Sequence, residues 1–173
     1  LEIPDENRLL GVGDGLKVTQ IRLGTARLTH CMRWLGLSKR CLEEASAYVA
    51  HRMSFGQTLA AHEGVQWMLG DVAKDIQIGR LLTMQAAWKL DQGDFARSDI
   101  SIAKIHAADT LHKAADTAIQ LLGARGYSKD TIVEWIYRYA RQARLVDGAS
   151  EIHKMVLSRA YLSEGQDFFR WGV

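Results

Sequence analysis

A single proline, Pro4, is the sequence feature that most limits how this 173-residue chain can fold. Proline lacks a backbone N–H and clashes with the preceding helical turn, so the rest of the chain is free of the strongest helix breaker. The 15 glycines must therefore provide most of the breaks between elements. We expect a chain made mainly of long helices.

Apolar residues recur at helical spacing in five segments. These segments are about Val18–His51, about Leu59–Leu90, about Ser98–Leu122, about 128–145, and the stretch after Gly148. No segment shows the period-2 alternation of a strand. The pattern predicts an all-α fold, an up-down antiparallel four-helix bundle with additional short C-terminal helices. Trp67 and Trp88 fall at a spacing typical of core positions.

Three stretches of different character suggest a domain organisation. Residues 1–17 are rich in glycine and turn formers, which is typical of a linker or of the tail of a preceding β domain. Residues 18–165 carry the helical periodicity and form the predicted bundle domain. Residues 166–173, which include Trp171, are interpreted as a loose tail that could also pack in an oligomer.

The charge balance excludes several classes of protein. A net charge of +2, with 24% charged residues, does not suit a nucleic-acid-binding surface or a disordered tail. No apolar run approaches the roughly 20 residues that a transmembrane helix needs. Residues 1–6 also lack the basic flank and apolar stretch of a signal peptide. We expect an intracellular protein, cytoplasmic in a bacterium and in the mitochondrial matrix or another intracellular compartment in a eukaryote.

Cysteine and histidine spacing predicts neither a disulfide nor a metal site. Cys31 and Cys41 lie ten residues apart on one predicted helix, a rise of about 15 Å, which is too far for a disulfide. Both are therefore expected as thiols of the core. The histidines show no spacing typical of metal ligands.

Asp147 and Arg52 are the residues whose positions best suit chemistry. Asp147 directly precedes Gly148 at a junction of two predicted helices, where free amides and the helix dipole stabilise negative charge. It could serve as a plain N-cap or as a functional carboxylate. Arg52 follows the first predicted helix, where its charge could complement the helix dipole.

Three segments occur in order: Arg52-Met-Ser-Phe-Gly-Gln57, Gln120-Leu-Leu-Gly-Ala-Arg-Gly-Tyr127 and Asp147-Gly-Ala-Ser-Glu-Ile152. Together they resemble the C-terminal helical domain of the acyl-CoA dehydrogenases, flavoenzymes that desaturate acyl thioesters. The resemblance runs from Ile3 to about Tyr161, and the opening resembles the last strand of the family's middle β domain. The run Thr29-His-Cys-Met-Arg-Trp-Leu-Gly36 is most similar to the subgroup of acyl-CoA dehydrogenases 10 and 11.

The resemblance implies that Asp147 is the catalytic base. It aligns with the glutamate of the family segment Glu-Gly-Thr-Ser-Gln/Glu-Ile, although aspartate is one methylene shorter. Some members carry the base instead at the position of Ala26, which has no titratable group. Arg27 matches an arginine that lines the family's active site, and the resemblance implies a substrate-binding role for it.

The resemblance also implies an FAD site, completed by a neighbouring subunit. Arg52 would reach the pyrophosphate of that subunit's FAD. The other residues implied in cofactor binding are Ser54, Phe55, Glu63 (where glutamine is usual), Gln120, Gly123 and Glu151.

The function implied is α,β-desaturation of a fatty acyl-CoA, with Asp147 removing the α proton and a hydride leaving the β carbon for the flavin. The implied partners are an electron-transfer flavoprotein and further copies of the chain in a homodimer or homotetramer. Without the family's other domains, we expect the 173-residue chain to bind FAD poorly and to be inactive. Two alternatives stay open: a nitroalkane oxidase, flavin monooxygenase or acyl-CoA oxidase on the same fold, and a non-catalytic helical oligomerisation module.

Overall fold

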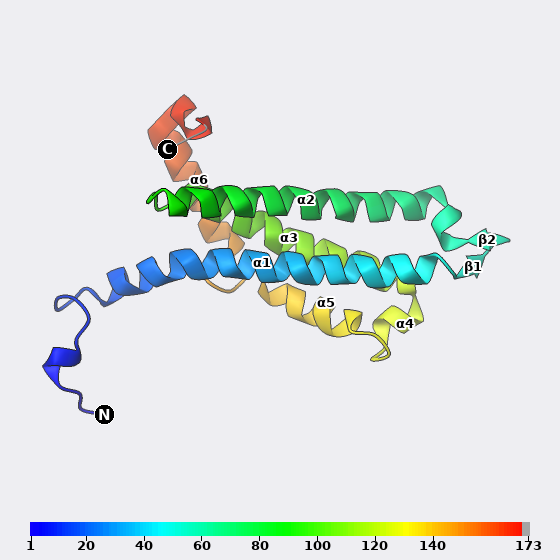
Figure 1. The fold of residues 1–173 in the computed structure, drawn as a ribbon, viewed down its shortest axis with the longest axis horizontal. Helices are drawn as coiled ribbons and strands as arrows, with labels where there is room; N and C mark the ends of the chain where they lie inside the picture. Colours follow the sequence, from blue (N-terminus) through cyan, green and yellow to red (C-terminus); the bar gives the residue numbers. More distant parts are fainter. Residues whose placement is uncertain (171–173) are drawn as a thin grey trace.

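The computed structural model describes residues 1–170, and three long helices dominate it (Figure 1). These are α1 (Gly15–Val49), α2 (Glu63–Asp91) and α3 (Arg97–Leu122). The shorter helices and turns are η1 (Asp5–Asn7), η2 (Leu59–Ala61), α4 (Ala124–Tyr127), α5 (Val133–Gln142), α6 (Ser150–Glu164) and η3 (Gly165–Phe169). The predicted all-α architecture is confirmed.

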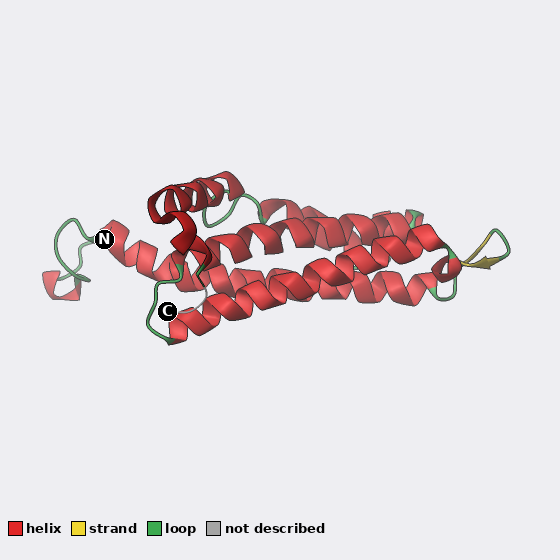
Figure 2. Cartoon of the chain, turned by 90° about the horizontal axis from the view of Figure 1, so that it is seen from above, coloured by secondary structure: helices red, strands yellow, loops and turns green. Residues whose placement is uncertain are grey.

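Helix α3 is the centre of the bundle, because it packs against α1, α2, α5 and α6. Six of its thirteen buried residues are alanine: Ala103, Ala107, Ala108, Ala114, Ala115 and Ala118. Small side chains let neighbouring helices approach closely. The larger side chains that fill the space come from the surrounding helices, among them Trp34 of α1, Val72 of α2 and Ile136 of α5. Figure 2 shows the long helices running alongside one another.

The fourth helix is shorter than the expected segment at about 128–145. Helix α5 has only 10 residues, about 15 Å, so it covers part of the bundle's length. Local side-chain contacts keep the chain before it out of the helical conformation. Ser128 Oγ accepts the N–H of Asp130, and Thr131 Oγ1 accepts the N–H of Val133. Such contacts compete with helical hydrogen bonds.

The expectation that Trp67 and Trp88 occupy core positions was wrong. They are 65% and 47% exposed, because both lie on the outer face of α2. The buried residues of that helix follow a different stripe: Val72, Ile76, Gly79, Thr83 and Ala86. Tryptophan has a strong apolar signal, but the smaller residues set the phase of this helix.

A short hairpin, which the sequence pattern did not indicate, joins α1 to α2. Strand β1 (Met53–Ser54) pairs antiparallel with β2 (Gln57–Thr58). The two residues between them, Phe55 and Gly56, have φ values of 49° and 80°. Two-residue hairpin turns favour this positive-φ geometry. The hairpin projects from the end of the bundle (Figure 1).

The two ends of the described chain differ in how they meet the bundle. Residues 1–14 extend away from it (Figure 1), and the assignment of 1–17 to a linker or preceding domain stays a prediction. At the other end, η3 packs its aromatic rings on α6, with the ring centroids of Phe168 and Tyr161 5.9 Å apart. Trp171 lies outside the described residues.

Both cysteines are buried as free thiols, as predicted. Within residues 1–170, no group of histidine, cysteine and acidic residues could hold a metal ion. No helix of that part of the chain is long and apolar enough to cross a bilayer.

Candidate active site

The turn between α5 and α6 places Asp147 in an unusual backbone conformation. Asp147 has a φ of 53° and Gly148 a φ of 96°, so two successive residues are left-handed. A non-glycine residue in that region costs about 1–3 kcal/mol and persists only where its surroundings hold it. The turn is therefore a place where the neighbouring side chains decide the backbone geometry.

Three side chains from three helices donate to the two carbonyl oxygens of this turn. Arg27 Nε of α1 donates to Asp147 O at 2.8 Å, and His153 Nε2 of α6 lies 3.3 Å from the same oxygen. Lys104 Nζ of α3 donates to Gly148 O at 2.9 Å. The α5–α6 turn is thus fixed to the bundle through its backbone.

The Asp147 carboxylate faces His30 of α1. The Oδ2 atom lies 2.6 Å from His30 Nε2, although the contact is not aligned as a hydrogen bond. The Arg33 guanidinium contacts His30 Nδ1, and arginine can only donate, so the ring proton belongs on Nε2 and faces the carboxylate. His30 also stacks on the buried Trp34, with ring centroids 5.4 Å apart. The side chain of Asp147 is 20% exposed, while its Oδ2 atom is buried against His30.

Burial shapes the electrostatics of the donors around the turn. Desolvation lowers the pKa of Lys104, while Cys31 and Asp147 act in the opposite direction. Burial likewise lowers the pKa of His153, which favours its neutral ring. The pKa of Arg27 is lowered by burial, and the Asp147 carboxylate opposes that shift. Among these groups, the Asp147 carboxylate acts on both Lys104 and Arg27 and opposes the effect of burial on each.

Glu151, implied near the flavin, lies in the first turn of α6. Its side chain is exposed, and Arg144 Nη2 lies 3.5 Å from its Oε1. Its own backbone N–H lowers the pKa of its carboxyl group. The structure therefore places Glu151 on the same turn as Asp147 but facing solvent.

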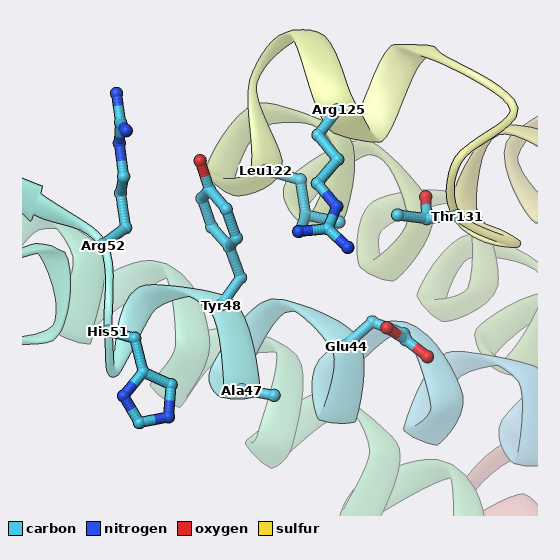
Figure 3. Close-up of a pocket in the computed structure, with 8 residues that line it drawn as sticks. All are labelled: Glu44, Ala47, Tyr48, His51, Arg52, Leu122, Arg125 and Thr131. Carbon is cyan, nitrogen blue, oxygen red and sulfur yellow. The ribbon is translucent and has the colours of Figure 1, made fainter.

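A second candidate site, a cavity of about 430 Å³, lies where α1 ends. Its lining comes from the last turns of α1, the end of α3, α4 and the loop before α5 (Figure 3). Arg52 and Arg125 form no ion pair within the described chain, whereas Glu44 is paired with Arg40 at 2.7 Å. Tyr48 stands between Arg52 and Arg125 in Figure 3. Two free guanidinium groups suit an anionic ligand such as a phosphate.

The remaining residues implied in cofactor binding lie at this same end of the bundle. Phe55 is 98% exposed at the tip of the hairpin, and the carbonyl of Ser54 contacts His62 Nε2 at 3.1 Å. Glu63 opens α2, where a carboxylate complements the helix dipole. Gln120 and Gly123 lie at the exposed end of α3. Gly123 has a φ of 60°, which explains a glycine there independently of any ligand.

The two clusters, one around Asp147 and one around Arg52, do not meet in one chain. Arg27 lies inside α1 and Arg52 lies just beyond its end, and the helix from Arg27 to Val49 alone corresponds to about 33 Å. A ligand that contacts Arg52 is therefore remote from Asp147 of the same chain.

Sequence reasoning assigned no role to Lys104, His153 or His30. Lysine and histidine in an amphipathic helix usually lie on the solvated face, so their residue types gave no signal of burial. The one available signal was the apolar and small residues on both sides of Lys104, as in Ile102-Ala-Lys-Ile105.

The domain is a helical bundle that holds a carboxylate on its α5–α6 turn and has a cavity with two arginines at its far end. This combination suits a phosphate-bearing ligand and acid–base chemistry. Residues 13–162 match the model of the acyl-CoA dehydrogenase C-terminal domain, and the chain belongs to that family.

Relatives named as dehydrogenases of acyl-CoA match nearly the whole chain. It is 37% identical to the probable acyl-CoA dehydrogenase IBR3 of Arabidopsis thaliana, over 91% of this chain and 20% of that protein. It is 34% identical to acyl-CoA dehydrogenase family member 11 of Gallus gallus, over 92% of this chain and 21% of that protein. The chain spans about a fifth of the length of these relatives.

Solved structures share the fold over a similar range. A glutaryl-coenzyme A dehydrogenase in complex with glutaryl-CoA matches with a TM-score of 0.89 and 31% identity, over 99% of this chain and 43% of that chain. A structure described as the electron transferring flavoprotein of Acidaminococcus fermentans matches with a TM-score of 0.88 and 28% identity, over 92% and 42% of the two chains.

Proposed function

We propose that this chain is the C-terminal domain of an FAD-dependent acyl-CoA dehydrogenase that desaturates a fatty acyl-CoA. The observation that carries the proposal is the position of Asp147, whose side chain is 20% exposed on a turn that donors from three helices hold in place. A base that abstracts a proton must be positioned before the substrate arrives, and this turn provides that positioning.

Asp147 acts as the base that removes the α proton of the acyl thioester. Efficient proton transfer requires a carboxylate oxygen of Asp147 within roughly 2.6–3.2 Å of the substrate's α carbon, which carries the proton. The backbone N–H of Asp147 finds no acceptor within the described chain, so it is free to donate to the thioester carbonyl. A hydrogen bond there would stabilise the negative charge that develops on the carbonyl oxygen.

Arg27 supports this step from behind the base. Its Nε is engaged by the carbonyl of Asp147 at 2.8 Å, so it fixes the turn rather than pointing its whole fork at a substrate. The substrate-binding role implied for Arg27 stays a proposal, carried by the guanidinium nitrogens that this bond leaves free.

The residues at the far end of the bundle fit the pyrophosphate of FAD. Arg52 and Arg125, which form no ion pair among residues 1–170, offer guanidinium groups beside the cavity, and Tyr48 adds an aromatic ring between them. When bound, FAD supplies the acceptor for the hydride that leaves the β carbon. Because about 33 Å of helix separates Arg27 from the end of α1 before Arg52, Arg52 would serve a cofactor whose reacting end lies at another subunit's Asp147. This favours a homodimer or homotetramer, with an electron-transfer flavoprotein as the electron acceptor.

The visible spectrum of the full-length protein that carries this domain tests the proposal. We expect a yellow protein whose flavin absorbance bleaches anaerobically with acyl-CoAs of one chain-length class. The 173-residue chain alone should bind FAD poorly and show no bleaching. A flavoprotein that ignores every acyl-CoA would contradict the proposal.

The aspartate at the base position favours one alternative, a nitroalkane oxidase-like reaction. Asp147 is shorter than the glutamate usual at this position, and its carboxylate contacts His30. Release of peroxide from nitroethane, without bleaching by acyl-CoA, would favour this reaction over acyl-CoA dehydrogenation. A protein without flavin would leave the non-catalytic oligomerisation module.

A further inference from the structure

We infer that Lys104, together with His153, is a positioning residue that holds the Asp147 carboxylate in place through the backbone of the α5–α6 turn. The inference rests on the proposed function, because it assigns these two side chains to the same step. Neither residue touches the carboxylate, and both act on the carbonyl oxygens of Asp147 and Gly148.

Lys104 is fully buried, which is rare for a lysine without an acidic partner. Its side chain is inaccessible to solvent, and no carboxylate lies within ion-pair distance of its Nζ among residues 1–170. The contacts of the ammonium group are Gly148 O at 2.9 Å and the ring of Trp34, whose centroid is 5.8 Å away. Burial of an ammonium group is costly unless its partners compensate. Here the ammonium group of Lys104 donates its hydrogen bond to a backbone carbonyl of the turn.

His153 contacts α3, the helix that carries Lys104. Its Nδ1 lies 3.0 Å from Ser101 Oγ, and its Nε2 faces Asp147 O at 3.3 Å. A carbonyl oxygen can only accept, so Nε2 carries the proton, and the neutral ring accepts from Ser101 at Nδ1. Ser101 and Lys104 are three residues apart and therefore lie on one face of α3. One face of α3 thus supports both carbonyls of the turn.

This arrangement determines where the carboxylate points. Both carbonyls are drawn toward the bundle while Asp147 and Gly148 stay left-handed, and the Asp147 side chain is directed to His30. Loss of Lys104 would free the peptide between Gly148 and Ala149 to rotate. Loss of His153 would loosen the peptide between Asp147 and Gly148, whose carbonyl Arg27 also holds. A displacement of about 1 Å at a reacting group can cost about 100-fold in rate.

The first experiment measures flavin reduction in the full-length enzyme carrying Lys104→Met, which keeps the length of the side chain but removes its donors. We expect the anaerobic reduction rate at saturating acyl-CoA to fall about 10- to 100-fold, with the substrate dissociation constant changed by less than about 3-fold. Lys113→Met is the matched control, because Lys113 lies on the same helix and pairs with Asp75 at the surface. Its rate should equal that of the unsubstituted enzyme.

A milder variant covers the case in which Lys104→Met does not fold. Ser101→Ala removes only the hydroxyl that holds His153 Nδ1, and we expect a loss of about 3- to 10-fold, the value of one hydrogen bond. Unchanged rates in every folded variant of Lys104 and Ser101 would overturn the inference while leaving the proposed function intact.

Hydrogen exchange provides a readout that needs no turnover. In Lys104→Met or Ser101→Ala, the amides of residues 145–150 should exchange about 5-fold faster or more, while those of α1 and α2 stay as in Lys113→Met. Unchanged exchange in the turn would overturn the inference. If the unsubstituted enzyme reduces no flavin with acyl-CoA, the proposed function fails, and the exchange result alone decides whether Lys104 holds the turn.

Discussion

His30 Nε2 lies 2.6 Å from Asp147 Oδ2, and this contact joins the middle of the bundle to the α5–α6 turn. The proposed base is therefore not a free carboxylate on a surface loop. Its partner ring stacks on the buried Trp34, so the position of the carboxylate is tied to the core. The structure holds Asp147 from two sides, by its backbone carbonyl through Arg27 and His153 and by its side chain through His30, while Lys104 holds the next carbonyl, that of Gly148.

Replacing His30 with leucine should slow flavin reduction in the full-length enzyme about 10-fold at saturating acyl-CoA, because the carboxylate loses the ring that orients it. Stopped-flow measurement of the reduction rate checks this. Thr29→Ala is the control, since Thr29 is exposed and bonds only to the backbone of its own helix. A His30→Leu enzyme as fast as the Thr29→Ala enzyme would show that the contact has no role in turnover.

Gly148→Ala should destabilise the chain more than Gly93→Ala. Both glycines have a positive φ, 96° and 86°, so both substitutions introduce backbone strain of about 1–3 kcal/mol. Only at Gly148 would the new Cβ meet another group, His153 Nε2 at 3.1 Å, whereas Gly93 faces open space. Urea unfolding of the two variants gives the difference directly. Equal losses of unfolding free energy would mean that His153 moves aside without cost.

Acidification should destabilise the fold partly through His153. Burial lowers its pKa from the ordinary 6.5, so below that pH the unfolded chain binds a proton that the folded chain does not. The stability contributed by the neutral ring is present above pH 6.5 and is lost as the pH falls toward the lowered pKa. The melting temperature should therefore fall less steeply between about pH 7 and about pH 5 in His153→Gln than in the unsubstituted chain. Parallel curves would exclude His153 as a source of the acid sensitivity.

The two thiols should resist alkylation in the folded state. Cys31 and Cys41 are fully buried, and desolvation raises the pKa of each to about 12. At a mildly alkaline pH neither is a thiolate, and the thiolate is the reactive species. Titration with a chromogenic disulfide should detect no fast thiol in the native chain and both after unfolding. One rapidly reacting thiol before unfolding would show that α1 opens locally.

The fold was predictable because the relevant signal is distributed along the chain. One proline, helical periodicity and glycine breaks together define α1, α2 and α3 to within a few residues. The phase of α2 was harder to predict, because Trp67 and Trp88 are strongly apolar yet face outward. No local pattern indicated the β1–β2 hairpin, since a two-residue strand is too short to show alternation.

The candidate site was predictable only in part. Motifs identified Asp147 and Arg27, and the structure brings them together through the Asp147 carbonyl. The supporting groups Lys104, His153 and His30 lie 43, 6 and 117 residues from Asp147 and on three different helices. Periodicity cannot show which polar side chain turns inward. The structure also separates Arg52 from Asp147, which no spacing along the sequence could reveal.

The most direct test of the account is the rate at which an acyl-CoA reduces the flavin of the full-length Asp147→Asn protein. Asparagine keeps the shape of the side chain but cannot take a proton, so the rate should fall about 10²- to 10⁴-fold, the usual contribution of a general base. Asp116→Asn, on the exposed face of α3, should reduce at the rate of the unsubstituted enzyme. An Asp147→Asn enzyme that reduces its flavin at the unsubstituted rate would contradict the central claim that Asp147 is the base.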